Sequence, residues 1–169
     1  MRAPRDFDNL IVRKIHPSDA DRIRELTIEG FDGVSIDQNS ERLFGTGPYP
    51  AWRERKWAGV RDQLDMHPAD HFVAELDGEV VGYITTGWSA ETRIGRIPDM
   101  AVDVRHRRHG IGSRLIERAL AHLLERGMTL AKIETLEQNA AGESLYSKHG
   151  FVEVARQIHF MRRLDDQSG

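Results

Sequence analysis

Short segments in which hydrophobic and polar residues alternate recur along the chain. Residues 10–16 (LIVRKIH) alternate as a strand does when one face is buried and the other is exposed. Asp77 and Gly78 form a two-residue link between two such segments, and this pair suits the positive φ angles of a tight hairpin. Alternation or a short apolar run predicts strands over residues 10–16, 71–76, 79–88, 93–104, 129–136, 151–155 and 157–164.

Other segments follow the period of an α-helix. Every fourth position from Ile111 to Leu123 is apolar, and Gly127 is placed to end that helix. Residues 32–50 show no clear period, which predicts a long irregular or short-helical connection. Helices are predicted over about residues 18–31, 51–66, 110–126 and 139–149, the first of them capped by Ser18 or Asp19.

The order of these elements is β-α-α-β-β-β-α-β-α-β-β, which places the chain in the α/β (α+β) class. A three-stranded meander followed by a β-α-β crossover predicts a mixed, mostly antiparallel central sheet of about six or seven strands, with helices on both faces. Ligands of such sheets bind beyond the strand ends, where neighbouring strands diverge.

Composition narrows the function classes. The 169 residues are 39% hydrophobic and 30% charged, as in an ordinary globular protein, and this length predicts a single domain over residues 1–169. A net charge of -3 gives no general attraction to nucleic acid or to a membrane, so neither is expected as a partner. The chain has no cysteine, which excludes disulfides and a thiol nucleophile. The first residues, MRAPRDFDNL, lack the apolar core of a signal peptide, so we expect a cytoplasmic location.

One basic segment, RHRRHGIGSRL at residues 105–115, stands out against this acidic background. It contains four arginines and no acid, and the glycines of Gly110-Ile111-Gly112 open a predicted helix. The first turn of a helix has unpaired N–H groups and the positive end of the helix dipole. The segment therefore predicts a binding site for an anion such as a diphosphate.

This basic segment matches the common nucleotide-binding motifs only in part. A nucleotide-hydrolase loop requires Gly-Lys-Ser/Thr, whereas Gly112 is followed by Ser113-Arg114, and a dinucleotide-binding fingerprint requires a glycine where Leu115 stands. A nucleic-acid site is disfavoured because residues 105–114 contain no aromatic side chain for base stacking. A solvated basic turn, whose glycines serve only the bend, remains an alternative.

The segment VDVRHRRHGIGSRLI resembles the acetyl-CoA signature of the GCN5-related N-acetyltransferase (GNAT) family. The core of that signature is Arg/Gln-x-x-Gly-x-Gly/Ala, matched by Arg107, Gly110 and Gly112. A second match lies downstream in NAAGESLYSKHGF, where Asn139 and Tyr146 have the family spacing and Lys-x-Gly-Phe follows. Gly at position 142, where the family commonly has Ala, is a small departure.

The resemblance covers about residues 10–164 and implies a GNAT-like acyl-CoA N-acyltransferase fold and an N-acetyltransferase activity with acetyl-CoA as cosubstrate and no metal. It implies direct transfer to a primary amine of a small molecule, peptide or protein within a ternary complex. Homodimers are frequent in such proteins, so a homodimer stays open. The acceptor side would comprise helices within about residues 18–67, and the acetyl-CoA-binding core about residues 93–151. The implied cofactor-binding residues are Ala101, Val102, Val104, Arg107, Arg108, His109, Gly110, Ile111, Gly112, Ser113, Asn139 and Tyr146.

Three residues are candidates for acid–base chemistry. Tyr146 is the candidate acid for the departing thiolate, because a phenol exceeds a thiol in pKa by only about 1.5 units; the alternative is an aromatic that only packs beneath its helix. Glu134 is the candidate base, with a solvent-facing strand-end glutamate as the alternative. Asp99, beside Pro98, is the second candidate base, and a structural carboxylate at a bulge is the alternative.

The acceptor amine determines how strong a base is needed. A lysine amine costs about 4 kcal/mol to neutralise near neutral pH, whereas an α-amine costs less than about 1 kcal/mol. Seven acids and three arginines between residues 19 and 49 would favour a cationic acceptor if they line its entrance, and solvated helix faces are the alternative. Tyr49, Trp52 and Trp57 are expected to pack a helix onto the sheet, with an acceptor pocket as the alternative.

Two further hypotheses concern the whole chain. Closely spaced histidines occur at positions 67 and 71 and at positions 106 and 109, but no third ligand accompanies either pair, so no metal site is expected. The alternative to an enzyme is a catalytically silent acyl-CoA sensor or interaction module of the same fold.

Overall fold

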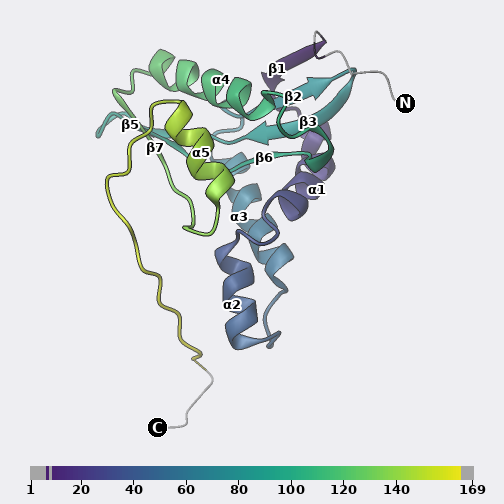
Figure 1. The fold of residues 1–169 in the computed structure, drawn as a ribbon, viewed down its shortest axis with the longest axis vertical. Helices are drawn as coiled ribbons and strands as arrows, with labels where there is room; N and C mark the ends of the chain where they lie inside the picture. The colour runs from purple at the N-terminus through teal and green to yellow at the C-terminus, as the bar shows by residue number, and fades with distance from the viewer. Residues whose placement is uncertain (1–6, 8, 165–169) are drawn as a thin grey trace.

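The computed structural model describes residue 7 and residues 9–164, and it places helices on both sides of two β-sheets (Figure 1). The strands are β1 (Leu10–Lys14), β2 (Phe72–Leu76), β3 (Glu79–Ile84), β4 (Gly87–Ser89), β5 (Ile94–Ile97), β6 (Met100–Val102) and β7 (Leu130–Ile133). The helices are α1 (Ala20–Gly30), α2 (Ile36–Phe44), α3 (Trp52–Met66), α4 (Ile111–Glu125) and α5 (Ala140–Lys148). The mixed α/β architecture is confirmed, with its strands divided between a four-stranded and a three-stranded sheet.

The four-stranded sheet is antiparallel and has the order β1-β2-β3-β6. The predicted hairpin between β2 and β3 is confirmed, because Asp77 and Gly78 have φ angles of 51° and 82°. These positive values are what a short link needs to match the twist of the two strands.

The three-stranded sheet, β4-β5-β7, shows where the sequence prediction was wrong. The single strand predicted over residues 93–104 divides at Pro98: β5 pairs in parallel with β7, and β6 pairs antiparallel with β3. Proline has no N–H for a ladder, and the N–H of Asp99 donates to the side-chain Oγ1 of Thr85 at 2.9 Å. The strand predicted over residues 79–88 likewise divides into β3 and β4.

Each face of the sheets has its own apolar core. The stripe of α4, including Leu115 and Leu123, packs with Phe72 and Ile84 on one face. On the other face, α1 and α3 bury Ile23, Leu26 and Val60 against β3 and β6. Helices on both faces were expected from the element order, and the periodicity of α4 correctly predicted its buried side.

The prediction of a long irregular or short-helical connection before residue 51 is confirmed. Within residues 32–50 the chain forms the short helix α2, whose N-cap Ser35 accepts a hydrogen bond from the N–H of Asp37. Trp52 is 3% exposed and Trp57 packs against the second core, as expected. None of the helices in the described ranges is both long and apolar enough to cross a bilayer. The expectation about the first residues lies largely outside the described part of the chain.

The two C-terminal strands, predicted over residues 151–155 and 157–164, are not formed. The chain is extended there, leaves the body beyond α5 and runs toward α2 (Figure 1). Alternation makes a segment suitable for a sheet, but a strand exists only when another strand supplies hydrogen bonds. Among the described strands none pairs with this segment.

Candidate active site

Strand β6 has one hydrogen-bonded edge and one open edge. The carbonyl of Asp99 accepts from the N–H of Thr85 at 2.9 Å, and the N–H of Asp103 donates to the carbonyl of Val81 at 2.9 Å. Because bonding groups alternate along an antiparallel strand, the backbone groups of Met100 and Val102 point to the opposite edge. Within the described residues β6 pairs with β3 alone, so this edge can bond an extended ligand.

Beyond β6 the chain turns into the start of α4. A 3-10 turn (Val104–His106) follows β6, and Arg108 and Gly110 have φ angles of 66° and 78°. The cap residue Gly110 offers no side chain to the helix, and the first bond within it runs from the N–H of Arg114 to the carbonyl of Gly110. The three preceding N–H groups, of residues 111–113, therefore have no partner within the helix and suit an anion.

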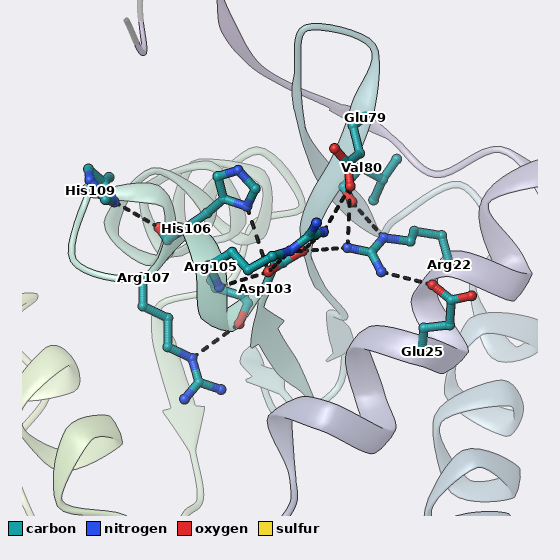
Figure 2. A network of polar contacts seen from close by, with 10 residues as sticks. Arg22, Glu25, Glu79, Val80, Asp103, Arg105, His106, Arg107 and His109 are labelled. Atoms are coloured by element: carbon teal, nitrogen blue, oxygen red, sulfur yellow. Dashed lines mark hydrogen bonds and ion pairs between the residues drawn. The ribbon is translucent and has the colours of Figure 1, made fainter. Parts of the chain in front are cut away.

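A cluster of charges beside this turn holds it in place (Figure 2). The carboxylate of Asp103 accepts from Nη2 of Arg105 at 2.6 Å and from Nη2 of Arg22, on α1, at 2.6 Å. Arg22 also donates to the carbonyl of Val80 at 3.0 Å. The hydrogen bond from Arg105 is the main reason that the pKa of Asp103 lies well below its ordinary value, although burial opposes it. Sequence patterns did not indicate Asp103 or Arg22, because their pairing is long-range.

Some arginines of the basic segment are engaged in this cluster, and others remain exposed. Arg105 is engaged with Asp103 and with Glu79, the latter at 3.0 Å. Arg107 donates to the carbonyl of Val102 at 3.2 Å, on the open edge of β6, while its guanidinium remains exposed. Arg108 is also exposed, so positive charge remains available around the first turn of α4.

The remaining predicted cofactor-binding residues lie between β6 and the first turn of α4, and their side chains have different surroundings. Ala101 is paired with Tyr83 in the ladder, and Val104 lies in the 3-10 turn instead of a strand. The ring of His109 stacks on Phe7 at 4.4 Å between centroids. The side chain of Ile111 is buried in the core, so only its backbone faces the turn. A Cβ at Gly112 would lie 3.1 Å from Leu145, and Ser113 is half-buried beside it.

The two candidate bases, Asp99 and Glu134, lie where two neighbouring segments of the chain diverge. The parallel pairing of β5 and β7 ends at the pair Ile97 and Ile133. Beyond this pair, the segment that contains Asp99 continues into β6, whereas the segment that contains Glu134 continues toward α5. Both carboxylates therefore lie where these two segments diverge. Divergence of neighbouring strands is where the sequence analysis expected a ligand to bind.

The environments of these carboxylates differ. Asp99 is buried, and its Oδ1 lies 2.5 Å from Nζ of Lys56, which reaches it from α3. The same ammonium lies 3.8 Å from the ring centroid of Phe31. Glu134 is exposed and forms an ion pair with Lys132 at 2.6 Å. Asp99 is therefore a buried carboxylate fixed by an ion pair, whereas Glu134 is a solvent-exposed carboxylate.

Helix α5 presents the second predicted motif. Asn139 caps it, as expected, because its Oδ1 accepts from the N–H of Gly142 at 3.1 Å. Tyr146 is half-buried, contacts Phe151 edge-on at 6.2 Å and packs on the core. Burial raises the pKa of the Tyr146 phenol, so the hydroxyl stays protonated and able to donate near neutral pH.

The segment before α5 is hydrogen-bonded to α2 and to the loop that precedes it. Nε2 of Gln138, just before α5, donates to the carbonyl of Gly33 at 2.6 Å, and Asn39 of α2 donates to Oε1 of Gln138 at 2.9 Å. The two acids of α2, Asp37 and Glu41, form ion pairs with Arg55. The described residues contain no cluster of three or more metal-ligating side chains.

Comparison with known proteins adds independent observations. The sequence model of the acetyltransferase (GNAT) family matches residues 34–151. An N-alpha-acetyltransferase of Sulfurisphaera tokodaii is 33% identical over 110 residues, covering 59% of this chain and 66% of that protein. A mycothiol acetyltransferase of Streptomyces coelicolor is 33% identical over 85 residues, covering 50% of this chain and 28% of that protein. The chain thus matches less than two thirds of the length of these relatives.

Solved structures agree on the fold. Ard1 from Thermoplasma volcanium superposes with a TM-score of 0.64 at 26% identity, covering 87% of this chain and 85% of that one. The PaiA N-acetyltransferase from Thermoplasma acidophilum, solved in complex with coenzyme A, has a TM-score of 0.66 at 17% identity and covers 83% of this chain and 87% of that one. At that identity the second similarity shows the fold alone.

Proposed function

Because the chain belongs to the acetyltransferase (GNAT) family, we propose that it is an acetyl-CoA-dependent N-acetyltransferase acting on a primary amine by direct attack in a ternary complex. One observation carries this proposal: the open edge of β6 leads, through the turn at residues 103–110, into the uncapped first turn of α4. An extended chain ending in a diphosphate requires a strand edge followed by an anion site.

The residues present fit coenzyme A. The free N–H groups of residues 111–113 would bind anionic phosphates, and Arg107 and Arg108 add exposed positive charge. A Cβ on Gly110 would meet no atom within 4 Å, so a ligand can approach the backbone there. The backbone of Val102, on the open edge of β6, would bond the pantetheine arm. Acetyl-CoA supplies the acetyl group as a thioester.

The reaction needs one proton removed and one supplied. The acceptor nitrogen forms a bond to the acetyl carbon, the carbon–sulfur bond breaks, and the thiolate takes up a proton. Tyr146 is assigned as the proton donor because its phenol is protonated near neutral pH, although the burial that raises its pKa makes transfer to the thiolate more uphill. Asp99 or Glu134 would take the proton of the amine. Asp99 is the better supported of the two because it is buried at the divergence, whereas Glu134 is solvated.

The acceptor is assigned only as a primary amine. Relatives named mycothiol acetyltransferase and N-alpha-acetyltransferase indicate that similar chains act on different acceptors. The bridge from Gln138 to Gly33 and Asn39 holds α2 beside the segment that leads into α5, which supports α2 as a contact for the acceptor.

The test combines binding with turnover. Calorimetric titration of coenzyme A, and release of free thiol from acetyl-CoA with polyamines, aminoglycosides and peptides, would be measured on the same preparation. Saturable binding together with amine-dependent thiol release is expected. Binding without release on any acceptor would favour the acyl-CoA sensor, and the absence of both would overturn the assignment.

A further inference from the structure

Two interruptions of the strands face each other beside the candidate base Asp99. Residues 85 and 86 lie between β3 and β4, and residues 98 and 99 lie between β5 and β6, so neither pair belongs to a strand. The register of β3 and β6 continues far enough to place Thr85 opposite Asp99. Asp99 therefore lies at the junction of the four-stranded and three-stranded sheets, opposite a threonine.

The hydroxyl of Thr85 takes the place of a backbone carbonyl at this junction. Two residues that form a hydrogen-bonded pair in an antiparallel ladder exchange two bonds between N–H and carbonyl groups. One of these bonds is present, because the N–H of Thr85 donates to the carbonyl of Asp99 at 2.9 Å. The N–H of Asp99 instead donates to Oγ1 of Thr85 at 2.9 Å, and that hydroxyl donates to the carbonyl of Asp99 at 3.3 Å. A side chain therefore fixes the backbone of Asp99 where regular strand geometry ends.

Burial makes this arrangement difficult to replace. Thr85 is 0% exposed and Asp99 is 6% exposed, so water is not at hand to bond the N–H of Asp99 if the hydroxyl is removed. The carboxylate of Asp99 is held separately, by the ammonium of Lys56 at 2.5 Å. The candidate base is thus fixed at its main chain from the end of β3 and at its carboxylate from α3.

We propose that Thr85 is a positioning residue for acetyl transfer, whose buried hydroxyl sets the main-chain position of Asp99 and thereby the direction of its carboxylate. The inference rests on the proposed function, in which Asp99 takes the proton of the amine. A general base works only within hydrogen-bond reach of the proton that it removes. A displacement of about 1 Å at a reacting group can lower a rate by about 100-fold. Thr85 acts through Asp99, because its hydroxyl is bonded to the backbone of that residue on both its donor and its acceptor side.

Substitutions at position 85 test the hydroxyl. Thr85→Val keeps the branched shape of the side chain and removes its polar atom. With the amine that releases most thiol in the panel of polyamines, aminoglycosides and peptides, kcat should fall at least about tenfold. Calorimetry should give an unchanged affinity for coenzyme A, which also reports that the variant is folded. Thr85→Ser restores the hydroxyl and should restore most of kcat, and Thr85→Ala gives the same readout as valine if valine prevents folding.

The next residue supplies a matched control. Thr86 is 1% exposed, and its hydroxyl donates to the carbonyl of Asp70 at 2.5 Å. Thr86→Val therefore also removes one buried hydroxyl and leaves one buried backbone group without that partner, so both valine variants should lose similar amounts of Tm. Thr86→Val should nevertheless keep the kcat of the unchanged chain. Equal losses of kcat in the two valine variants would overturn the positioning role.

A double variant shows whether Thr85 acts through Asp99. On an Asp99→Asn background the carboxylate is already absent, so adding Thr85→Val should lower kcat by no more than about twofold. An equal loss on both backgrounds, or an unchanged kcat of Thr85→Val alone, would overturn the positioning role and leave the proposed function intact. Absence of amine-dependent turnover from the unchanged chain would overturn the proposed function itself, and the positioning role with it.

Discussion

Replacing Lys56 by methionine removes the cation that faces the buried carboxylate of Asp99. The two atoms lie 2.5 Å apart, and the side chains are only 18% and 6% exposed. Removing one partner of such a pair costs about 3–5 kcal/mol, because the remaining charge is left without compensation. Taking the lower end, since Lys56 keeps some contact with water, we expect a loss of about 3 kcal/mol. For a chain of this size that lowers Tm by about 6–12 °C.

Urea unfolding of four proteins measures this coupling. Lys56→Met and Asp99→Asn are the single variants, and the chain carrying both changes completes the double-mutant cycle. The double variant buries no unpaired charge, so it should recover about 2 kcal/mol relative to the sum of the single effects. Additive single effects, or a Lys56→Met loss below about 0.5 kcal/mol, would refute a buried, energetically coupled pair.

The same double variant separates stability from chemistry. If Asp99 takes the proton of the amine, turnover should fall by about 100-fold or more even where folding is restored. Turnover equal to that of the unchanged chain would transfer the base assignment to Glu134.

Three further predictions concern the cofactor path and the acid. Tyr146→Phe should lower kcat by about 100-fold with coenzyme A affinity unchanged in calorimetry, and equal kcat would remove Tyr146 from the mechanism. Gly110→Ala forces a side chain to a φ angle of 78° and should cost about 1–2 kcal/mol in unfolding free energy, whereas Gly59→Ala, inside α3, should stabilise by up to about 1 kcal/mol. Because the folded-state pKa of Asp103 is depressed, its stabilisation exists above about pH 4 and disappears as pH falls; Asp103→Asn should therefore show a flatter dependence of unfolding free energy on acid pH, and equal slopes would contradict the ion cluster.

Several features followed from local sequence because their physics is local. Asp77-Gly78 accepts positive φ, Asn139 caps the helix that follows it, and the four-residue spacing of α4 selects its buried face. The helix that opens with Gly110-Ile111-Gly112 likewise has N–H groups without partners in its first turn, whatever the rest of the fold is. The proposed coenzyme A site depends on the last of these features.

Contacts between distant positions could not be predicted in this way. Lys56 meets Asp99 across 43 positions and Arg22 meets Asp103 across 81, and no local pattern selects these partners from the other charged residues of the chain. Pro98 indicated an interruption of the ladder, but only the sheet shows that β5 and β6 then bond different neighbours.

The sequence alone determined which segments favour helix or strand, where the tight turns lie, and which turn exposes anion-binding N–H groups, because each depends on dihedral preferences and periodicity within a few residues. Tertiary structure alone decided which charges pair, where the strands diverge, and that residues 151–164 remain extended without a ladder. A strand needs the hydrogen bonds of a neighbour, and a buried charge needs a partner placed by the whole fold. Neither the neighbouring strand nor the charged partner can be identified from the sequence of the segment that needs it.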